Sequence, residues 1–286
     1  MRGKWAILAV AVTLVTGIAI AQAPARLTVD TATMYCSGLI TTEAVPNDSY
    51  IISGEQSDPY YVFKMNDFVY INRGSGQGAK IGDEFLVVRP VDDANKQEWF
   101  HSQAELKRAM GQTWVDVGRI RVLHVDDKVS TAQIVSACGY MQRGDLIRPF
   151  VERPAPAYRP NSAIVDPFTP ATGKVGMVVM TKDFGQVAGN KAVVYVNLGS
   201  SQGLRVGSYV RVFRRQGDHR EYAYQTAGMQ DTVYGFGSSP VRYTWEGLPR
   251  EILGEGIVVR VSNNTATVMI TATRREIFVG DYTEVE

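Results

Sequence analysis

The sequence predicts a mainly all-β protein made of two tandem small β-barrels that are related by internal duplication, with one short helix in the first. Two observations lead to this prediction. A block of 22 residues occurs twice, and its two copies align without a gap. Around both copies, short runs of Val, Ile, Tyr and Thr alternate with polar residues and end at Gly, Asn, Asp or Ser. This pattern is typical of half-buried strands joined by tight turns.

The two copies of the block are VYINRGSGQGAKIGDEFLVVRP, residues 69–90, and VYVNLGSSQGLRVGSYVRVFRR, residues 194–215. Ten of the 22 positions are identical. Downstream, residues 117–148 match residues 253–285, because each stretch has an alternating strand, a polar turn, a second alternating strand and a closing Gly-Asp pair. Similarity on this scale indicates a duplicated domain rather than a repeated turn.

The duplication sets the expected domain boundaries. The first barrel is expected over residues 34–149 and the second over residues 174–286. Between them, residues 150–173 are rich in proline, which is typical of an extended linker. About five or six strands in each repeat are enough to close a small barrel, and closure removes unpaired strand edges. A helix is predicted at residues 102–112, between the third and fourth strands, where the second domain has a longer insertion at residues 216–250.

The N-terminus has the layout of a secretory signal peptide. A short basic start precedes an apolar run, and small residues then offer cleavage after Ala21 or, as the alternative, after Ala23. The run of about 16 residues is shorter than the roughly 20 that span a bilayer, so an uncleaved anchor is the less favoured interpretation. We therefore expect a signal peptide over residues 1–21 and an exported protein without an integral membrane segment. It would lie in the periplasm or on the periplasmic face of the outer membrane.

Charge and cysteine content narrow the expected partners. The chain has 30 basic and 29 acidic side chains, and without residues 1–21 the balance is 28 to 29. Such a chain lacks the basic surplus of a general nucleic-acid binder, so nucleic acid is not an expected partner. An even number of cysteines in an exported chain predicts a disulfide between Cys36 and Cys138, with two buried free thiols as the alternative.

The Gly-rich loop of the repeat has two interpretations. Residues 74–79 fit the looser form of a dinucleotide-binding fingerprint, which requires a strand before the loop and a helix after it. Here the loop is followed by strand-like EFLVV, so the context is wrong. The second copy also has Ser201 where Gly76 stands. We therefore expect no cofactor and interpret the shared glycines as structural turn positions. They are Gly74, Gly78, Gly82, Gly199, Gly203 and Gly207.

The pattern VYxNxGSxxGxxxGxxxxV, followed by VGxIxVxxV and a final Gly-Asp, resembles the C-terminal β-domain of the flagellar assembly protein T family. The resemblance covers each repeat but neither the linker nor the insertions. It implies a small periplasmic β-barrel without catalytic residues in each half. The β-domains of the rod-shape-determining cell-wall elongation protein are similar too, but more weakly, and this chain lacks that family's transmembrane helix and coiled coil.

No residue is predicted to be catalytic or to bind a metal. The three histidines have no second His, Cys or carboxylate at metal-ligand spacing. The candidate binding surface is instead formed by aromatic residues near the two insertions, where exposed rings could stack on a sugar or anchor a partner protein. The alternative is that these rings fold onto their own barrel. The candidates are Trp99, Trp114, Tyr222, Tyr224, Tyr234, Tyr243 and Trp245.

These observations favour a non-enzymatic exported envelope protein that acts as a scaffold or interaction module. Its expected partner is an envelope protein complex or a cell-wall component such as glycan. One alternative is a secreted carbohydrate-binding module that uses the aromatic insertion loops. A less favoured alternative is a hydrolase with a site between the two barrels, which an interdomain cleft lined by convergent polar groups would support. The oligomeric state stays open.

Overall fold

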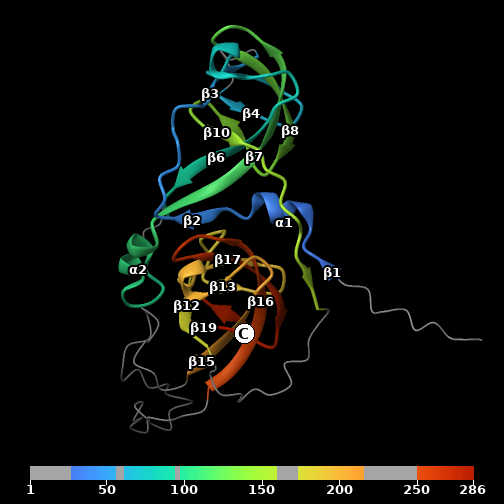
Figure 1. The fold of residues 1–286 in the computed structure, drawn as a ribbon. Helices are drawn as coiled ribbons and strands as arrows, with labels where there is room; N and C mark the ends of the chain where they lie inside the picture. Colours follow the sequence, from blue (N-terminus) through green and yellow to red (C-terminus); the bar gives the residue numbers. More distant parts are fainter. Residues whose placement is uncertain (1–26, 56–60, 94–96, 160–172, 216–249) are drawn as a thin grey trace, which may run out of the picture.

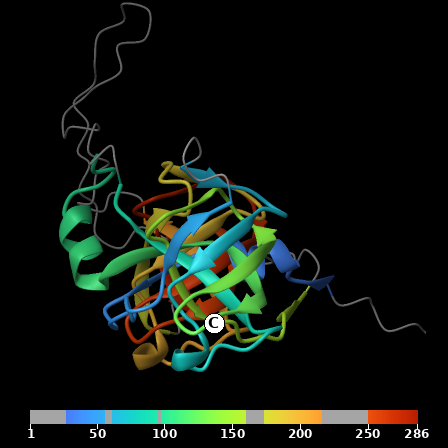
Figure 2. The same cartoon turned by 90° about the horizontal axis from the view of Figure 1, so that it is seen from above.

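The computed structural model describes residues 27–55, 61–93, 97–159, 173–215 and 250–286. The chain forms two β-sheet domains, one above the other in Figure 1, and an N-terminal segment lies between them. Seen along the stacking direction, the two domains overlap and α2 stands out on one side (Figure 2). Within the described ranges, no helix is both long and apolar enough to cross a bilayer.

The second domain is a closed six-strand barrel, as predicted. Its strands follow one another around the barrel in the order β12-β14-β17-β16-β15-β19. They are β12 (Val175–Thr181), β14 (Val193–Val196), β15 (Tyr209–Arg215), β16 (Arg250–Val261), β17 (Ala266–Thr273) and β19 (Tyr282–Val285).

The first domain repeats this order but closes less regularly. Its six strands run β3-β5-β8-β7-β6-β10, and the two ends of the sheet meet only through an antiparallel bridge between Tyr50 and Leu146. Backbone hydrogen bonds flank this bridge, one of them from Ile51 to Asp145 at 2.9 Å. We call this nearly closed sheet the first barrel. Its strands are β3 (Ile51–Gly54), β5 (Phe68–Ile71), β6 (Glu84–Val91), β7 (Gln112–Val125), β8 (Ser130–Ala137) and β10 (Leu146–Pro149).

The small elements confirm the duplication. A 3₁₀ turn follows β5 and β14, and a two-residue ribbon pairs at one end of each barrel. The turns are η1 (Ser75–Gln77) and η2 (Ser200–Gln202). The ribbons are β4 (Val62–Phe63) with β9 (Met141–Gln142), and β13 (Val187–Ala188) with β18 (Ile277–Phe278). Each strand, turn and ribbon of one barrel therefore has a counterpart in the other.

One helix was predicted, and the described residues form two α-helices. The predicted helix is α2 (Gln103–Met110), which connects β6 to β7 as expected. The helix that the sequence did not reveal is α1 (Thr31–Cys36), where the Asp30 carboxylate caps the Thr33 N–H at 2.8 Å. With six residues, α1 is too short to show a helical repeat of apolar positions. It leads into β2 (Leu39–Thr41), which pairs with β7 of the first barrel.

The described part of the predicted linker is extended but not free. β11 (Ala157–Tyr158) pairs with β1 (Leu27–Thr28). Beyond it, the Arg159 guanidinium lies 2.6 Å from carboxylate oxygens of both Glu255 and Glu286 in the second barrel. The linker therefore docks on the second barrel as far as residue 159, and residues 160–172 lie outside the described ranges.

Candidate functional site

In the Gly-rich loop, the amides of residues 74–79, which a phosphate would need, all donate hydrogen bonds within the protein. The Ser75 N–H donates to the Asp126 carbonyl at 2.9 Å, and the Gly76 N–H donates to the Asp127 carbonyl at 3.1 Å. The Gly74 N–H is bound by the Gln77 side chain at 2.8 Å. The second copy makes the same bonds, from Ser200 to Ser262, from Ser201 to Asn263 and from Gly199 to Gln202. The loop therefore fastens the β7–β8 turn of its own barrel, which is a structural role.

The six predicted turn glycines are needed for two different reasons. Gly74 has an extended backbone, but a Cβ there would lie 2.4 Å from the Asp127 carbonyl oxygen. Its counterpart Gly199 meets the carbonyls of the β16–β17 turn in the same way. The other four have positive φ, between 80° and 96°, which favours glycine. They are Gly78, Gly82, Gly203 and Gly207.

An Arg–Asp clamp is also repeated. Arg89 holds Asp145 through two hydrogen bonds of 2.6 and 2.8 Å, and the same carboxylate accepts the Gln142 N–H at 2.8 Å. In the second barrel, Arg214 holds Asp281 at 2.7 and 2.8 Å. Both aspartates belong to the Gly-Asp pairs, and both arginines are identical positions of the repeated block. The sequence comparison showed that the arginine and the aspartate are each repeated, but only the structure shows that they bind each other.

The N-terminal segment, residues 27–41, fills the contact zone between the barrels. Met34 of α1 packs on Ile257, Val259 and Met269 on the outside of the second barrel. In the first barrel the same three places hold Arg121, Leu123 and Gln133, as the matching strand registers show. The second barrel therefore has an apolar outer face that this segment covers.

Hydrogen bonds fasten the same segment to the second barrel. The Tyr195 hydroxyl donates to the Ser37 carbonyl at 2.8 Å, and the Thr41 and Ser262 hydroxyls are 2.7 Å apart. Burial raises the pKa of Tyr195 above its ordinary value, so this hydroxyl stays protonated and can donate. The Thr265 hydroxyl donates to the Ile40 carbonyl. The segment is thus held by apolar packing and by buried polar bonds together.

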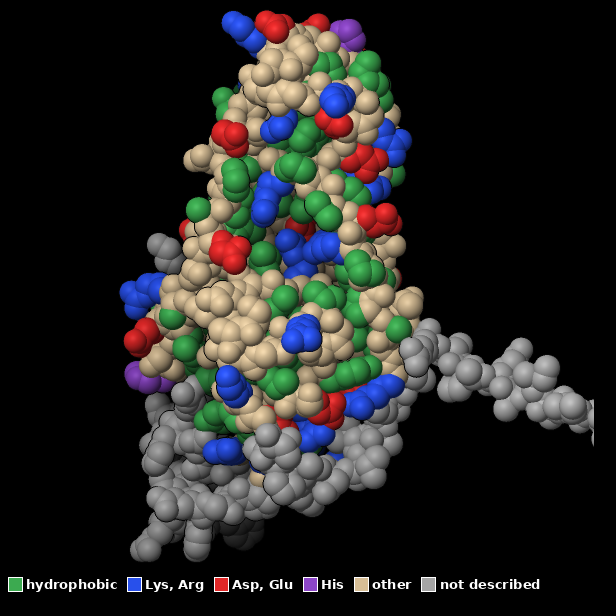
Figure 3. All heavy atoms as spheres, viewed as in Figure 1, with side chains coloured by type: hydrophobic (Ala, Val, Ile, Leu, Met, Phe, Trp, Pro, Cys, Tyr) green, Lys and Arg blue, Asp and Glu red, His purple; other side chains and the backbone are tan. Residues whose placement is uncertain are grey.

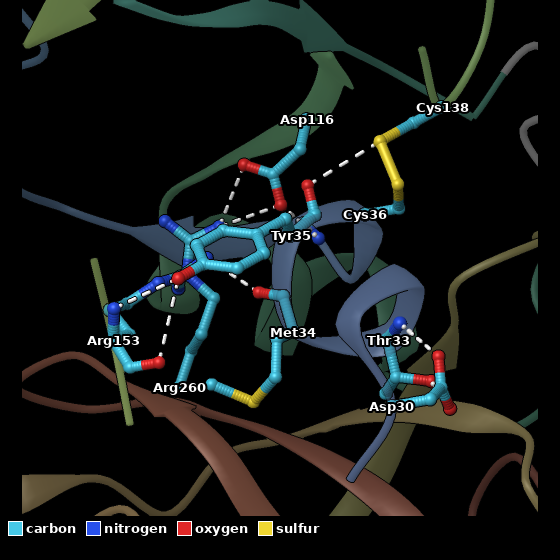
Figure 4. The surroundings of a disulfide bond; sticks show 10 residues. Asp30, Thr33, Met34, Tyr35, Cys36, Asp116, Cys138, Arg153 and Arg260 are labelled. Carbon is cyan, nitrogen blue, oxygen red and sulfur yellow. Dashed lines mark hydrogen bonds and ion pairs between the residues drawn. A yellow bond between two sulfur atoms is a disulfide. The ribbon is translucent and has the colours of Figure 1, made fainter. Parts of the chain in front are cut away.

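A buried ion pair joins the two barrels. Asp116 of β7 accepts two hydrogen bonds from Arg260 of β16, at 2.8 and 2.9 Å, and a third from the Gly38 N–H at 2.9 Å. Figure 4 shows Arg260 and Asp116 beside Tyr35 and the disulfide. One carboxylate therefore contacts the first barrel, the N-terminal segment and the second barrel.

The predicted disulfide between Cys36 and Cys138 is present, with the two Cα atoms 5.5 Å apart. Cys36 ends α1, and Cys138 directly follows β8 of the first barrel. The bond therefore ties the segment that packs on the second barrel to the first barrel (Figure 4). This role between domains was not evident from the sequence, which placed both cysteines in one domain.

The contact zone bears on the hydrolase alternative. In Figure 3 several Lys and Arg side chains gather between the barrels. A hollow of about 200 Å³ lies between α1 and the first barrel, with Arg119 in its wall. That arginine pairs with Glu84 at 3.2 Å and lies over the Phe150 ring at 4.6 Å. The N-terminal segment and paired side chains therefore occupy much of the space between the barrels, where the hydrolase alternative would place its site.

The tryptophans of the candidate binding surface are half-buried. Trp99 packs against the core of the second barrel, whereas Trp114 lies on β7 itself and not in the insertion. The alternative that these rings fold onto the protein therefore describes their positions better than an exposed platform does. The other five candidates lie outside the described ranges. They are Tyr222, Tyr224, Tyr234, Tyr243 and Trp245.

Exposed apolar residues gather at a different place, on the first barrel. Tyr50 and Ile52 are 39% and 38% exposed, and Gly144 beside them has open space around it among the described residues. We call these three residues the uncovered face. Their counterparts in the second barrel, Met177 and Val179, are almost completely buried. The sequence did not single out this face because exposure depends on what the rest of the chain covers.

A pocket of about 440 Å³ opens at the end of the first barrel that carries the β4–β9 ribbon. Val62 and Tyr140 line it, together with the charged residues Lys64 and Asp67. Tyr61, at 72% exposure, and Tyr140, at 70%, are among the most exposed large hydrophobic residues described. We call this hollow the end pocket.

The described residues include no group of three or more His, Cys, Asp or Glu side chains placed to hold a metal ion. The sequence matches no protein-family model, and a comparison with curated proteins finds no similar protein. The resemblance of each half to the flagellar assembly protein T domain stays a prediction.

Proposed function

We propose that this protein is a non-enzymatic, exported envelope protein that serves as a two-barrel scaffold and binds a partner protein through its first barrel. The observation that carries the proposal is the uncovered face of Tyr50, Ile52 and Gly144. Aliphatic and aromatic groups at the centre of an interface contribute most of the binding energy when a partner excludes water from them. The matching face of the second barrel is already buried within the chain.

The disulfide supports the export part of the proposal. Disulfides persist in oxidising compartments such as the bacterial periplasm and are rare in the reducing cytosol. Cys36 and Cys138 are bonded, and the N-terminal residues have the pattern of a secretory signal peptide. The connection between the barrels supports the scaffold part, because a fixed spacing of two domains preorganises a binding surface.

Chemical cross-linking in intact cells tests the proposal. The tagged protein is cross-linked in the envelope, purified and compared with an Ile52→Asp variant, which places a charge on the uncovered face. Val206→Asp is the matched control, because Val206 is 46% exposed in a turn of the second barrel. We expect an adduct with wild type and Val206→Asp that is lost with Ile52→Asp. Identical adducts for all three proteins, or recovery of the protein in the cytosolic fraction, would contradict the proposal.

The end pocket supports a second candidate function, glycan binding. The exposed Tyr140 lines a pocket that also holds Lys64 and Asp67, and the exposed Tyr61 directly precedes Val62 of its wall. Sugar sites combine aromatic faces with polar side chains. Co-sedimentation with purified peptidoglycan tests this candidate. Glycan binding predicts that wild-type protein pellets with the glycan and that Tyr61→Ala and Tyr140→Ala stay in the supernatant. Equal pelleting of all three proteins would argue against it.

A further inference from the structure

The two barrels differ most clearly in what covers one equivalent face. Ile52 in β3 and Val179 in β12 occupy the same place, because each lies at the register shift of its strand pair. The Gly144 N–H donates to the Ile51 carbonyl, and the Gly280 N–H donates to the Val178 carbonyl, both at 2.8 Å. The residues of the two faces can therefore be compared one by one.

In the second barrel, the face is covered by the connection between β6 and β7 of the first barrel. The Phe100 ring lies against Gly280, where an added Cβ would be 3.1 Å from it. The Gln103 side-chain amide donates to the Val179 carbonyl at 2.7 Å in a buried hydrogen bond. As a result, Val179 has no exposed surface. α2 lies beside β12 in Figure 1.

In the first barrel, the same face has no such cover among the described residues. Ile52 is 38% exposed against 0% for Val179, and Tyr50 is 39% exposed against 3% for Met177. Nothing described lies within 4 Å of a Cβ built on Gly144. Ile52 lies at a β-bulge, and bulges are often found where a side chain is re-aimed at a functional site.

The geometry points to a second copy of this chain as the occupant of the uncovered face; we propose that its β15–β16 connection docks there. The β6–β7 connection of the first barrel covers the barrel that follows it in the chain. The β15–β16 connection leaves the second barrel from the equivalent strands, and the equivalent barrel to follow is the first barrel of another copy. This inference rests on the proposed function, because it names the partner of the first barrel.

The sequence of the β15–β16 connection fits this role. The connection in the first barrel presents Trp99 and Phe100 to the next barrel. Residues 216–249 also carry several aromatic side chains, among them Tyr243 and Trp245. Such a contact joins two different surfaces, so it is head-to-tail and can continue into a chain or close into a ring.

Sedimentation velocity over a range of protein concentrations tests the proposal. Wild-type protein is expected to form dimers and larger species, and Ile52→Glu is expected to weaken this association by about tenfold or more, because it buries a charge at the contact. The control is Ile81→Glu, since Ile81 is 70% exposed in the turn before Gly82 and outside the face. It should associate like wild type, and thermal unfolding shows whether each variant is folded.

A mixing experiment distinguishes this arrangement from other contacts. A variant with residues 216–249 replaced by a short Gly-Ser turn keeps the uncovered face, and Ile52→Glu keeps the connection. Each variant alone should be monomeric, and an equimolar mixture should form a one-to-one dimer and nothing larger. A wild-type protein that stays monomeric, or a mixture that does not associate, would overturn the head-to-tail proposal. If wild type is monomeric but a different protein is cross-linked in an Ile52-dependent way, the proposed function stands without it.

Discussion

At the residue scale, the duplication acts as an internal comparison of the two copies. It separates glycines that the backbone requires from one that it does not. Gly74 and Gly199 both lie against carbonyl oxygens of the following hairpin turn. Gly76, in contrast, corresponds to Ser201, whose hydroxyl donates to the Asn263 carbonyl at 2.8 Å. Gly76, the residue most suggestive of nucleotide binding, is therefore at a position where the fold also accepts serine.

Serine substitutions at the two positions test this distinction. Gly74→Ser should lower the free energy of unfolding by more than about 2 kcal/mol, because its Cβ would overlap the Asp126 and Asp127 carbonyls. Gly76→Ser is the matched control and should change it by about 0.5 kcal/mol or less, since a Cβ there lies 3.3 Å from the Asp127 carbonyl. Urea unfolding measures both, and equal effects would refute the structural role assigned to Gly74.

The Arg–Asp clamp leads to a second prediction at this scale. Asp145→Ala should destabilise the protein by about 3 kcal/mol, the lower end for a broken buried ion pair, because Arg89 keeps 28% side-chain exposure. It also leaves the Gln142 N–H without its acceptor. Asp126→Ala is the control, since its carboxylate is 67% exposed. Two variants with indistinguishable urea midpoints would show that the clamp contributes little.

At the element scale, the N-terminal segment decides how the barrels are joined. β2 pairs with β7 of the first barrel, and the disulfide ties α1 to the same barrel. Both elements also contact the second barrel. The first barrel has the polar residues Arg121 and Gln133 on its outside, where the second barrel has Ile257 and Met269. This difference explains why α1 covers the second barrel. Loss of this cover would expose apolar surface on the second barrel to water.

The cap of α1 gives a pH-dependent prediction. The hydrogen bond from the Thr33 N–H keeps the pKa of Asp30 below its usual value of 3.8. The charged cap therefore stabilises the fold above that value, and this stabilisation is lost as the pH falls through the lower folded-state pKa. Asp30→Ala should cost about 1 kcal/mol at pH 7 and much less in strong acid. Asp30→Asn keeps a good cap without a charge. The contribution of the Asn cap to stability should therefore not fall in acid, whereas that of the Asp30 cap should.

The disulfide gives the second prediction at this scale. Replacing Cys36 and Cys138 together by Ser should lower the free energy of unfolding by about 2–5 kcal/mol, because the bond closes a loop with a sequence separation of 102 residues. It should also increase hydrogen exchange in residues 31–41, where α1 and β2 lie against the second barrel. Unchanged exchange there would show that the disulfide does not hold the segment in place.

The sequence was sufficient for the elements that follow local rules. Alternating strands and turn glycines could be checked against the second copy, whereas α2 and the disulfide were predicted without a second copy. α1, the docking of residues 150–159 and the uncovered face have no repeat to reveal them. They depend on contacts such as Met34 with Ile257, which join residues far apart in the chain and leave no local pattern.

At the scale of the whole molecule, the two barrels form one connected body. The core of the second barrel includes Ile40, Phe100 and Met110, all from the first half of the chain. The Asp116–Arg260 ion pair and the linker add polar contacts across the same zone. Since packing is shared between the halves, we expect them to unfold together, in one transition seen by calorimetry. Two separate transitions would indicate independent barrels.

The central claim is that the first barrel binds a partner at its uncovered face. The most direct test is site-specific photo-crosslinking in intact cells, with a photoreactive amino acid at position 52 and, as control, at position 81. We predict a covalent adduct from position 52 and none from position 81. An adduct of twice the chain mass would identify the partner as a second copy. Absence of any adduct at position 52, or equal adducts at both positions, would contradict the claim.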